Sequence, residues 1–155
     1  MNKYVVAVIA CVAINTTAAA AVSVSAPWVR ATVPVQKSSG AFMVLQASAD
    51  ARLVGVSSPA AGAVEMHRSQ MKGTLMSMQQ VEAIALPAGQ RVDLASGGYH
   101  LMLTGLKQQL KEGSTVTLTL VVQHANGKRE LLSVAAPVKP IGYAPSPAAP
   151  ASSTH

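Results

Sequence analysis

Cysteine and aromatic residues are scarce in this chain of 155 residues. Cys11 is the only cysteine, and the aromatic side chains are one tryptophan, one phenylalanine and three tyrosines. A single cysteine cannot close a disulfide within the chain, and no C-x-x-C-H motif is present to attach a c-type haem. Nucleic-acid binding needs stacking aromatics or a clustered basic stripe, whereas the basic residues here are scattered. We therefore expect neither covalent haem nor a nucleic-acid partner.

Acidic residues are also few. The chain has six Asp and Glu residues, none of them paired at close spacing, and it lacks both the G-x-S-x-G and the H-E-x-x-H motif. We therefore expect a protein that is not an enzyme. The formal net charge of +6 favours solubility, with some bias toward acidic partners or membrane surfaces.

Long hydrophobic runs are missing as well. The apolar stretch Tyr4–Ile14 is shorter than the ~20 residues that a bilayer-spanning helix needs. It follows Lys3 and precedes the small residues Ala18–Ala21, a pattern typical of a secretory signal peptide. We predict a signal peptide over residues 1–21, with cleavage near Ala20 or Ala21 and no stable membrane insertion afterwards.

A lipoprotein processing site is the alternative at this end of the chain. Val8–Cys11 faintly resembles such a site, but the apolar stretch before it is very short and the usual leucine is missing. We therefore favour ordinary cleavage, which removes Cys11 and leaves an exported domain without a thiol.

From Val22 onward the sequence consists of short apolar or β-branched runs separated by Gly, Pro and Ser clusters, a pattern that predicts strands. The expected strands are Val22–Thr32, Gly40–Ala47, Arg52–Ser58, Val64–Ser69, Leu75–Val81, Arg91–Ala95, Tyr99–Thr104, Thr115–Gln123 and Arg129–Ala135. No segment has a convincing helical stripe, and Leu106–Leu110 could form one helical turn at most. This spacing favours an all-β protein, an antiparallel sandwich or a small barrel.

Asn126-Gly127 is the strongest hairpin signal, because both residues tolerate the positive φ of a type I′ turn. His124, just before this turn, is expected to be exposed to solvent. The segment from Gly142 to His155 is rich in Pro, Ala and Ser and has no periodicity. We expect one domain over residues 22–138 and a disordered tail over residues 139–155.

Methionine and histidine gather in two places. Four methionines fall within thirteen residues, and His67 lies among them (Met66, Met71, Met76 and Met78). Strand side chains alternate between two faces, so Met76 and Met78 lie on one face of their strand and Leu75 and Val81 on the other. In the later strand, His100 and Met102 lie on one face, and Tyr99, Leu101 and Leu103 lie on the other. Each methionine taken alone could fill the core, but two strands that turn thioether or imidazole away from their apolar face favour a metal site.

The ligand types indicate which metal. Thioether sulfur is soft and suits Cu(I) far better than Zn²⁺, Mg²⁺ or Ca²⁺, and neutral imidazole is a good copper ligand. Methionine also avoids the loss of paired thiols to disulfides in an oxidising compartment. A blue-copper centre is excluded in the cleaved chain, because that centre requires a cysteine thiolate.

The spacing of the histidines and methionines, together with the segments that flank them, is similar to that of a known family. His67 is followed after ten residues by Met78, after twenty-one more by His100, and after one more by Met102. The flanking phrases are Trp28–Thr32, Ser39–Met43, Leu86–Gly89 and Gly97–Leu110. In these features residues 22 to 137 resemble the PCu(A)C family of periplasmic copper chaperones.

The resemblance implies a cupredoxin-like antiparallel β-sandwich with Greek-key connections. It implies one Cu(I) per chain, held near the surface by His67, Met78, His100 and Met102. The implied role is delivery of copper to the CuA site of cytochrome c oxidase in the periplasm, with an oxidase subunit or another copper assembly factor as the partner. We expect a monomer.

Several residues beside this pattern have open assignments. Arg68-Ser69 stand where relatives often carry an acidic residue and a methionine, so a cation beside the site could lower copper affinity or alter the partner surface. Met66 is expected in the core. Met71 and Met76 could be alternate ligands, although Met76 is better explained as shielding the site. His155 is a weak candidate for a second copper site.

The alternative function is an exported β-sandwich that serves as a binding or adhesion module, with structural methionines and no specific metal. In that case replacing Met78 and Met102 by leucine would leave ligand binding intact.

Overall fold

The computed structural model describes residues 21–95 and 98–145, and this part of the chain contains ten strands and no helix. The predicted all-β class is therefore confirmed. The strands are β1 (Val22–Arg30), β2 (Ser38–Ala47), β3 (Ala51–Ser57), β4 (Ala61–Lys72), β5 (Leu75–Gln80), β6 (Ile84–Leu86), β7 (Arg91–Leu94), β8 (Tyr99–Leu106), β9 (Thr115–His124) and β10 (Arg129–Lys139).

Some predictions lie outside the described residues. These are the signal peptide apart from Ala21, the cleavage site at Ala20, Cys11, and His155 with the last ten residues of the tail. The described chain continues beyond residue 138, since β10 includes Lys139 and the ring of Tyr143 lies edge-on to Trp28 with centroids 4.9 Å apart. No helix long and apolar enough to cross a bilayer occurs in the part that the structure describes.

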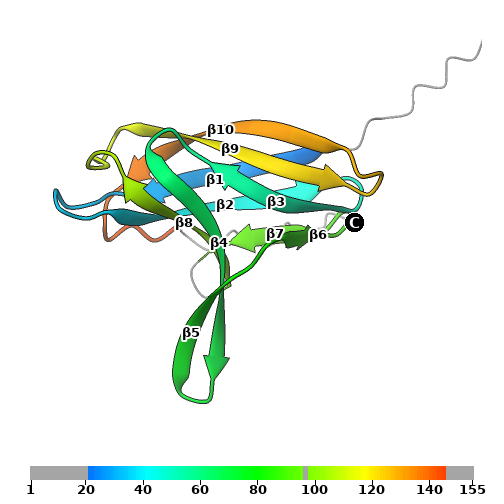
Figure 1. Ribbon diagram of the computed structural model, residues 1–155, viewed down its shortest axis with the longest axis horizontal. Coiled ribbons are helices and arrows are strands. Elements are labelled where there is room, and N and C mark those ends of the chain that lie inside the picture. The colour runs from blue at the N-terminus through cyan, green and yellow to red at the C-terminus, as the bar shows by residue number, and fades with distance from the viewer. Residues whose placement is uncertain (1–20, 96–97, 146–155) are drawn as a thin grey trace, which may run out of the picture.

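The strands form a continuous hydrogen-bonded order, β5-β4-β8-β2-β1-β10-β9-β3-β6, with β7 paired to β2. This sheet folds over into two layers, and β10 and β9 lie above β1 and β2 in Figure 1. Alternate residues of the two layers meet in one core, in which Leu45 of β2 and Leu118 of β9 are fully buried. The period-two pattern of each strand thus decides which side chains enter the sandwich.

The pairing corrects the prediction of a wholly antiparallel arrangement at one point. β1 and β10 are parallel, with Val29 opposite Val138, so the sheet is mixed. β1 and β10 are the first and last strands of the domain. No hairpin turn connects them, so nothing in the local sequence requires them to be antiparallel. The short strand β6 was also not predicted, because its three residues are too few to show an alternating pattern.

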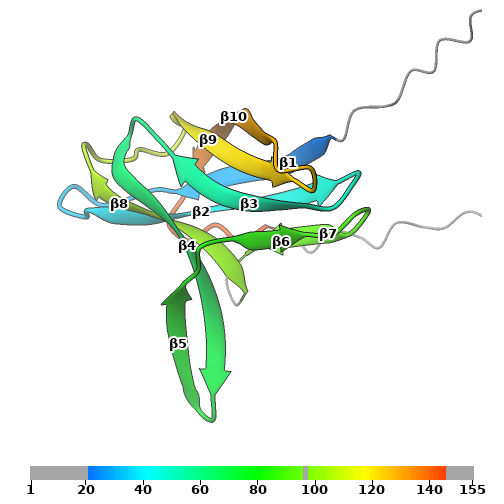
Figure 2. The same ribbon diagram turned by 45° about the vertical axis from the view of Figure 1, so that its right-hand side comes forward.

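The β4–β5 hairpin projects from the sandwich (Figure 2). The first part of β4 pairs with β8 as far as Arg68 opposite Tyr99, whereas β4 from Ser69 to its end pairs only with β5. Its turn lies between Lys72 and Leu75 and begins with Gly73 at φ +64°. A glycine at the first central position is the signature of a type II′ hairpin turn. Two strands of the candidate site therefore extend beyond the body of the protein.

The β9–β10 hairpin confirms the turn at Asn126-Gly127 but not its type. Only Gly127 has a positive φ, at +84°, and its amide donates to the carbonyl of His124. This is a type I turn followed by a glycine bulge rather than a type I′ turn.

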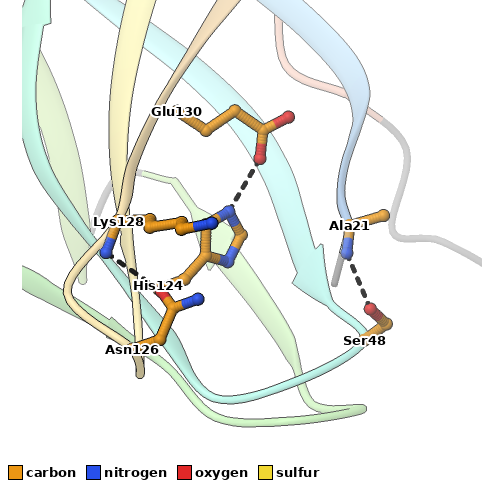
Figure 3. A network of polar contacts seen from close by, with 6 residues as sticks. All are labelled: Ala21, Ser48, His124, Asn126, Lys128 and Glu130. Carbon is orange, nitrogen blue, oxygen red and sulfur yellow. Dashed lines mark hydrogen bonds and ion pairs between the residues drawn. The ribbon is translucent and has the colours of Figure 1, made fainter. Parts of the chain in front are cut away.

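The prediction that His124 is exposed is wrong. Nε2 of His124 lies 2.8 Å from Oε2 of Glu130, and the side chain is largely buried (Figure 3). The strand pairing across the hairpin brings these two residues together, which local sequence does not reveal.

Candidate metal centre

The four predicted ligands lie on one face of the three strands β5, β4 and β8. His67 of β4 is directly opposite His100 of β8, and Met78 of β5 is opposite Ser69, two residues from His67 on the same face. Met102 is two residues from His100. Residues directly opposite one another share a face of the sheet, as do residues two apart on one strand. The register thus brings ligand types from three strands to one surface.

The reverse face of β8 anchors the strand as the alternation predicts. Leu101 and Leu103 are fully buried in the core, and Tyr99 packs partly buried against it. Met66 of β4 is opposite Leu101 and is also buried in the core, which confirms its predicted place. The face that carries the predicted ligands is therefore held in position by apolar burial on the other side.

The two imidazoles are adjacent, and three of their four ring nitrogens are buried without a hydrogen-bond partner. The ring centroids of His67 and His100 are 5.6 Å apart with planes at 64°. His100 is only 4% exposed, and neither of its ring nitrogens has a hydrogen-bond partner. Buried polar groups are normally hydrogen-bonded, so each exception calls for an explanation. A nitrogen lone pair without a hydrogen bond is what a metal ion would use.

Burial also affects the protonation of His100. Loss of contact with water lowers the pKa of His100, and the nearby His67 lowers it further, while the backbone at Gly98 acts in the opposite direction. Burial disfavours the charged imidazolium. The ring is thereby kept in the neutral form that binds metals.

Glu65 determines which nitrogen of His67 is free. Its Oε2 lies 2.8 Å from Nε2 of His67, and a carboxylate can only accept this hydrogen bond, so Nε2 carries the proton. In a neutral imidazole the lone pair is then on Nδ1, which is buried without a partner. Metal-binding histidines commonly donate their other N–H to a carboxylate. Sequence reasoning missed Glu65, although its place two residues before His67 puts it on the same face.

The thioethers of Met78 and Met102 face a groove of about 370 Å³. Its lining comes from five strands and consists of Arg30, Gly40, Phe42, Ser69, Met76, Met78, His100 and Met102. Three of the four predicted ligands therefore line one groove. His67 is not in the lining and lies beside it, against His100. Met78 is 58% exposed, so the groove is open to solvent at the hairpin.

An aromatic layer borders the groove on the β1–β2 side. Phe42 stacks on Trp28 with ring centroids 4.4 Å apart, and the guanidinium of Arg30 lies 5.3 Å from the centroid of Phe42. The Phe42 ring lies over Gly40, where a Cβ atom would come within 2.7 Å of its Cζ. Arg30, Gly40 and Phe42 line this groove, and Trp28 stacks on Phe42. All four occur in the flanking segments noted in the sequence, but only the structure shows this arrangement.

A model of the LpqE-like family, described as "Putative lipoprotein LpqE-like", matches residues 22–138. The chain belongs to the LpqE-like family. A curated relative, "Putative lipoprotein Lxx21020" from Leifsonia xyli subsp. xyli, is 34% identical over 119 residues, which cover 76% of this chain and 69% of the relative.

Solved structures relate this LpqE-like chain to copper-binding domains. The copper-bound PCuAC domain of PmoF2 matches with a TM-score of 0.62 and 25% identity, over 77% of this chain and 92% of that domain. The Cu(I) form of DR1885 from Deinococcus radiodurans matches with a TM-score of 0.55 and 33% identity, over 75% of this chain and 76% of that protein. The LpqE-like chain is thus a homologue of PCuAC domains with their cupredoxin-like fold, which confirms the predicted resemblance.

The other residues of interest in this LpqE-like chain lie at different distances from the groove. Met76 lines it, whereas Met71 is opposite Met76 farther along the hairpin and does not. Arg68 is opposite Tyr99 on the reverse face, with its guanidinium 5.6 Å from the centroid of that ring. The side chain of Arg68 therefore points away from the face that carries His67, and a direct charge effect on that face is not expected.

The donor types of these residues also bear on the choice of metal. Across residues 21–95 and 98–145 no group of three His, Cys, Asp or Glu side chains is placed to hold a metal ion. The donors that do gather are two imidazoles and several thioethers, and these fit a soft monovalent ion.

Proposed function

We propose that this protein is a Cu(I) carrier that binds one copper ion in its principal site through His67, Met78, His100 and Met102. The observation that supports it best is that two kinds of copper donor lie on one face of β5, β4 and β8. These are imidazole nitrogens that are buried without a hydrogen-bond partner, and methionine thioethers. The similarity to a copper-bound PCuAC domain and to the Cu(I) form of DR1885 gives independent support.

The chemistry of the donor set suits a carrier rather than a catalyst. All four donors are neutral, and thioethers favour Cu(I) over harder ions. Met78 is well exposed, so an acceptor that supplies thiolates can reach the copper and displace the weaker neutral ligands one at a time. The copper ion is cargo in this scheme, and neither electrons nor protons need to be exchanged.

The decisive experiment is an anaerobic Cu(I) titration against a chromophoric chelator, using the protein purified after export. The test variant is Met78→Leu/Met102→Leu, and the matched control is Met66→Leu. Met66 is next to His67 on β4 but faces the core, so the control removes a nearby thioether without touching the groove. Methionine-to-leucine exchange preserves volume and costs less than about 1.5 kcal/mol in a core.

We expect the wild type and Met66→Leu to bind one strong equivalent of Cu(I), and the double variant to lose it. If the double variant binds copper as well as the wild type does, the thioethers are structural. The binding or adhesion module would then be the better interpretation.

We further propose that the acceptor is the CuA site of cytochrome c oxidase or a copper assembly factor that serves it. Mixing the Cu(I)-loaded protein with a metal-free CuA fragment and separating the two would test this. Copper should move to the fragment, and copper that stays on the carrier at equilibrium would point to another acceptor.

Export to the periplasm is part of the same proposal. The signal-like first 21 residues support it, and so does the description of both the family and the relative as lipoproteins. That description bears on the N-terminal processing, where cleavage near Ala20 or Ala21 removes Cys11 and processing before Cys11 would keep it with a lipid. The intact mass of the exported protein distinguishes these two products.

A further inference from the structure

The projecting part of the β4–β5 hairpin carries an unusual concentration of exposed thioethers. Met71, Met76 and Met78 are 62%, 60% and 58% exposed. Methionine usually fills irregular gaps in a core, and here three of them stand in solvent on a segment that pairs only with itself. Neither their packing nor the principal copper site accounts for all three.

The register places these three side chains together. Met71 is directly opposite Met76, and Met78 is two residues from Met76 on the same face of β5. Side chains that are directly opposite have Cβ atoms about 5 Å apart, and residues two apart on a strand are separated by about 7 Å. Methionine has three rotatable bonds beyond Cα, so the three sulfur atoms can meet at one ion.

The charges of the hairpin also fit a cation on this face. Ser69 and Gln80 share the face with the methionines and are neutral, whereas Arg68 and Lys72 lie on the reverse face by strand alternation. A monovalent metal ion at the methionines therefore meets no positive side chain of the hairpin on its own face.

We infer that Met71, Met76 and Met78 form a second, outer Cu(I) site on the projecting hairpin. This inference rests on the proposed carrier function and deepens it. Three thioethers select Cu(I) or Ag(I) over harder ions, and without an imidazole the outer site binds more weakly than the groove.

Met78 belongs to both sites and links them. It faces the outer pair on the hairpin and also lines the groove with His100 and Met102. Copper passes inward when its bond to the Met78 sulfur persists, the bonds to Met71 and Met76 break, and bonds to His100 and Met102 form. No electron is transferred and no proton is released, because every ligand is neutral. The hairpin is thus the entry and exit route of the groove.

The test is a titration of the exported protein, labelled with ¹³C at the methionine methyl groups, with Cu(I) under argon and separately with Ag(I). The first equivalent should shift the methyl signals of Met78 and Met102. The second should shift those of Met71 and Met76, and its copper then shares the sulfur of Met78, which has two lone pairs, with the copper in the groove. The signals of Met43 and Met66, which are buried in the core, should stay in place throughout and serve as internal controls.

Two variants sharpen the result. Met71→Leu/Met76→Leu should lose the second equivalent, keep the first, and release Cu(I) several-fold more slowly to a small dithiol chelator. Adding Leu75→Met to this variant restores a thioether at the tip, but on the reverse face, since Leu75 is opposite Lys72. It should not restore the second equivalent.

The outer site is refuted if the Met71 and Met76 signals do not move at two equivalents, or if Met71→Leu/Met76→Leu keeps the second equivalent. Failure of the carrier proposal looks different. In that case the first equivalent leaves the Met102 signal unchanged, whatever the three hairpin methionines do.

Discussion

Replacing Glu65 tests whether its carboxylate prepares His67 for copper. Oε2 of Glu65 accepts from Nε2 of His67 at 2.8 Å, and the side chains are 36% and 17% exposed. Glu65→Gln keeps an acceptor but removes the charge. A hydrogen bond to a charged group contributes about 1.5–3 kcal/mol, against about 0.5–1.5 kcal/mol for a neutral one. The difference is about 1 kcal/mol, or about fivefold in Kd.

Glu65→Ala removes the acceptor altogether, so the ring of His67 is free to rotate and to change tautomer. Loss of such a partner typically costs 10- to 100-fold in metal affinity, and the partial exposure of this pair favours the lower end, about tenfold. The two variants should therefore rank with Gln between the wild type and Ala. The assay is Cu(I) competition, together with nitrogen NMR of the His67 ring in the metal-free protein.

Glu130→Gln is the matched control. It alters a second histidine–carboxylate pair of the same length, between His124 and Glu130, on strands β9 and β10 away from the groove. It should leave copper affinity unchanged. Our reasoning fails if Glu65→Ala binds Cu(I) as tightly as the wild type while the ring of His67 keeps its proton on Nε2.

The remaining predictions concern the metal-free protein and the response of the hairpin to copper. Because the pKa of His100 is lowered by burial, the unfolded chain binds more protons than the folded chain below about pH 6.5. The unfolding free energy in urea should therefore fall as the pH drops from 7, by at most about 1.4 kcal/mol per pH unit from this residue, and His100→Gln should flatten that slope. Copper that joins Met78 of β5 to His100 and Met102 of β8 ties the hairpin to the sandwich. Amide exchange between residues 69 and 78 should slow on loading in the wild type but not in Met78→Leu, and equal slowing in both would contradict a bond to Met78.

The alternation of apolar and polar residues along single segments was sufficient to predict much of the fold. Thr115–Gln123 alternates cleanly and became β9 with one residue added, and its apolar half entered the core. In Tyr99–Thr104 the same period separated the anchoring residues from His100 and Met102. What a strand buries on one face can be read from its own residues, because the period of two is a local property of the backbone.

Long-range pairing could not be predicted in this way. The parallel contact between β1 and β10 joins residues that are more than one hundred positions apart, and no short motif encodes it. His124 shows the same limit at shorter range, because its burial depends on Glu130 across a bulged turn. At the candidate site, Glu65 and Phe42 were missed because their relevance depends on which strands become neighbours of β8.

The site also differs from the sequence-based expectation in how exposure varies across it. Alternation placed His100 on the face opposite Leu101 and Leu103, and the family resemblance implied a site near the surface, yet His100 is 4% exposed. Strand β8 has neighbours on both sides, β4 and β2, and His100 lines the groove together with Phe42. Met78 lies on β5, which is at one edge of the sheet and has β4 as its only neighbour in the strand order of the described residues, and it is 58% exposed.

This gradient in burial gives the proposed carrier a direction. The ligand that gains most from copper is His100, since its buried nitrogens have no other partner and an unmade buried hydrogen bond is costly. The ligand that loses least on releasing copper is Met78, because its side chain is already exposed to water and a thioether is only a weak hydrogen-bond acceptor. An acceptor from solvent therefore reaches the copper from the Met78 side, and His100 is the least accessible ligand. A fold that buries one ligand and places another on a projecting hairpin can bind the ion tightly and still release it one ligand at a time.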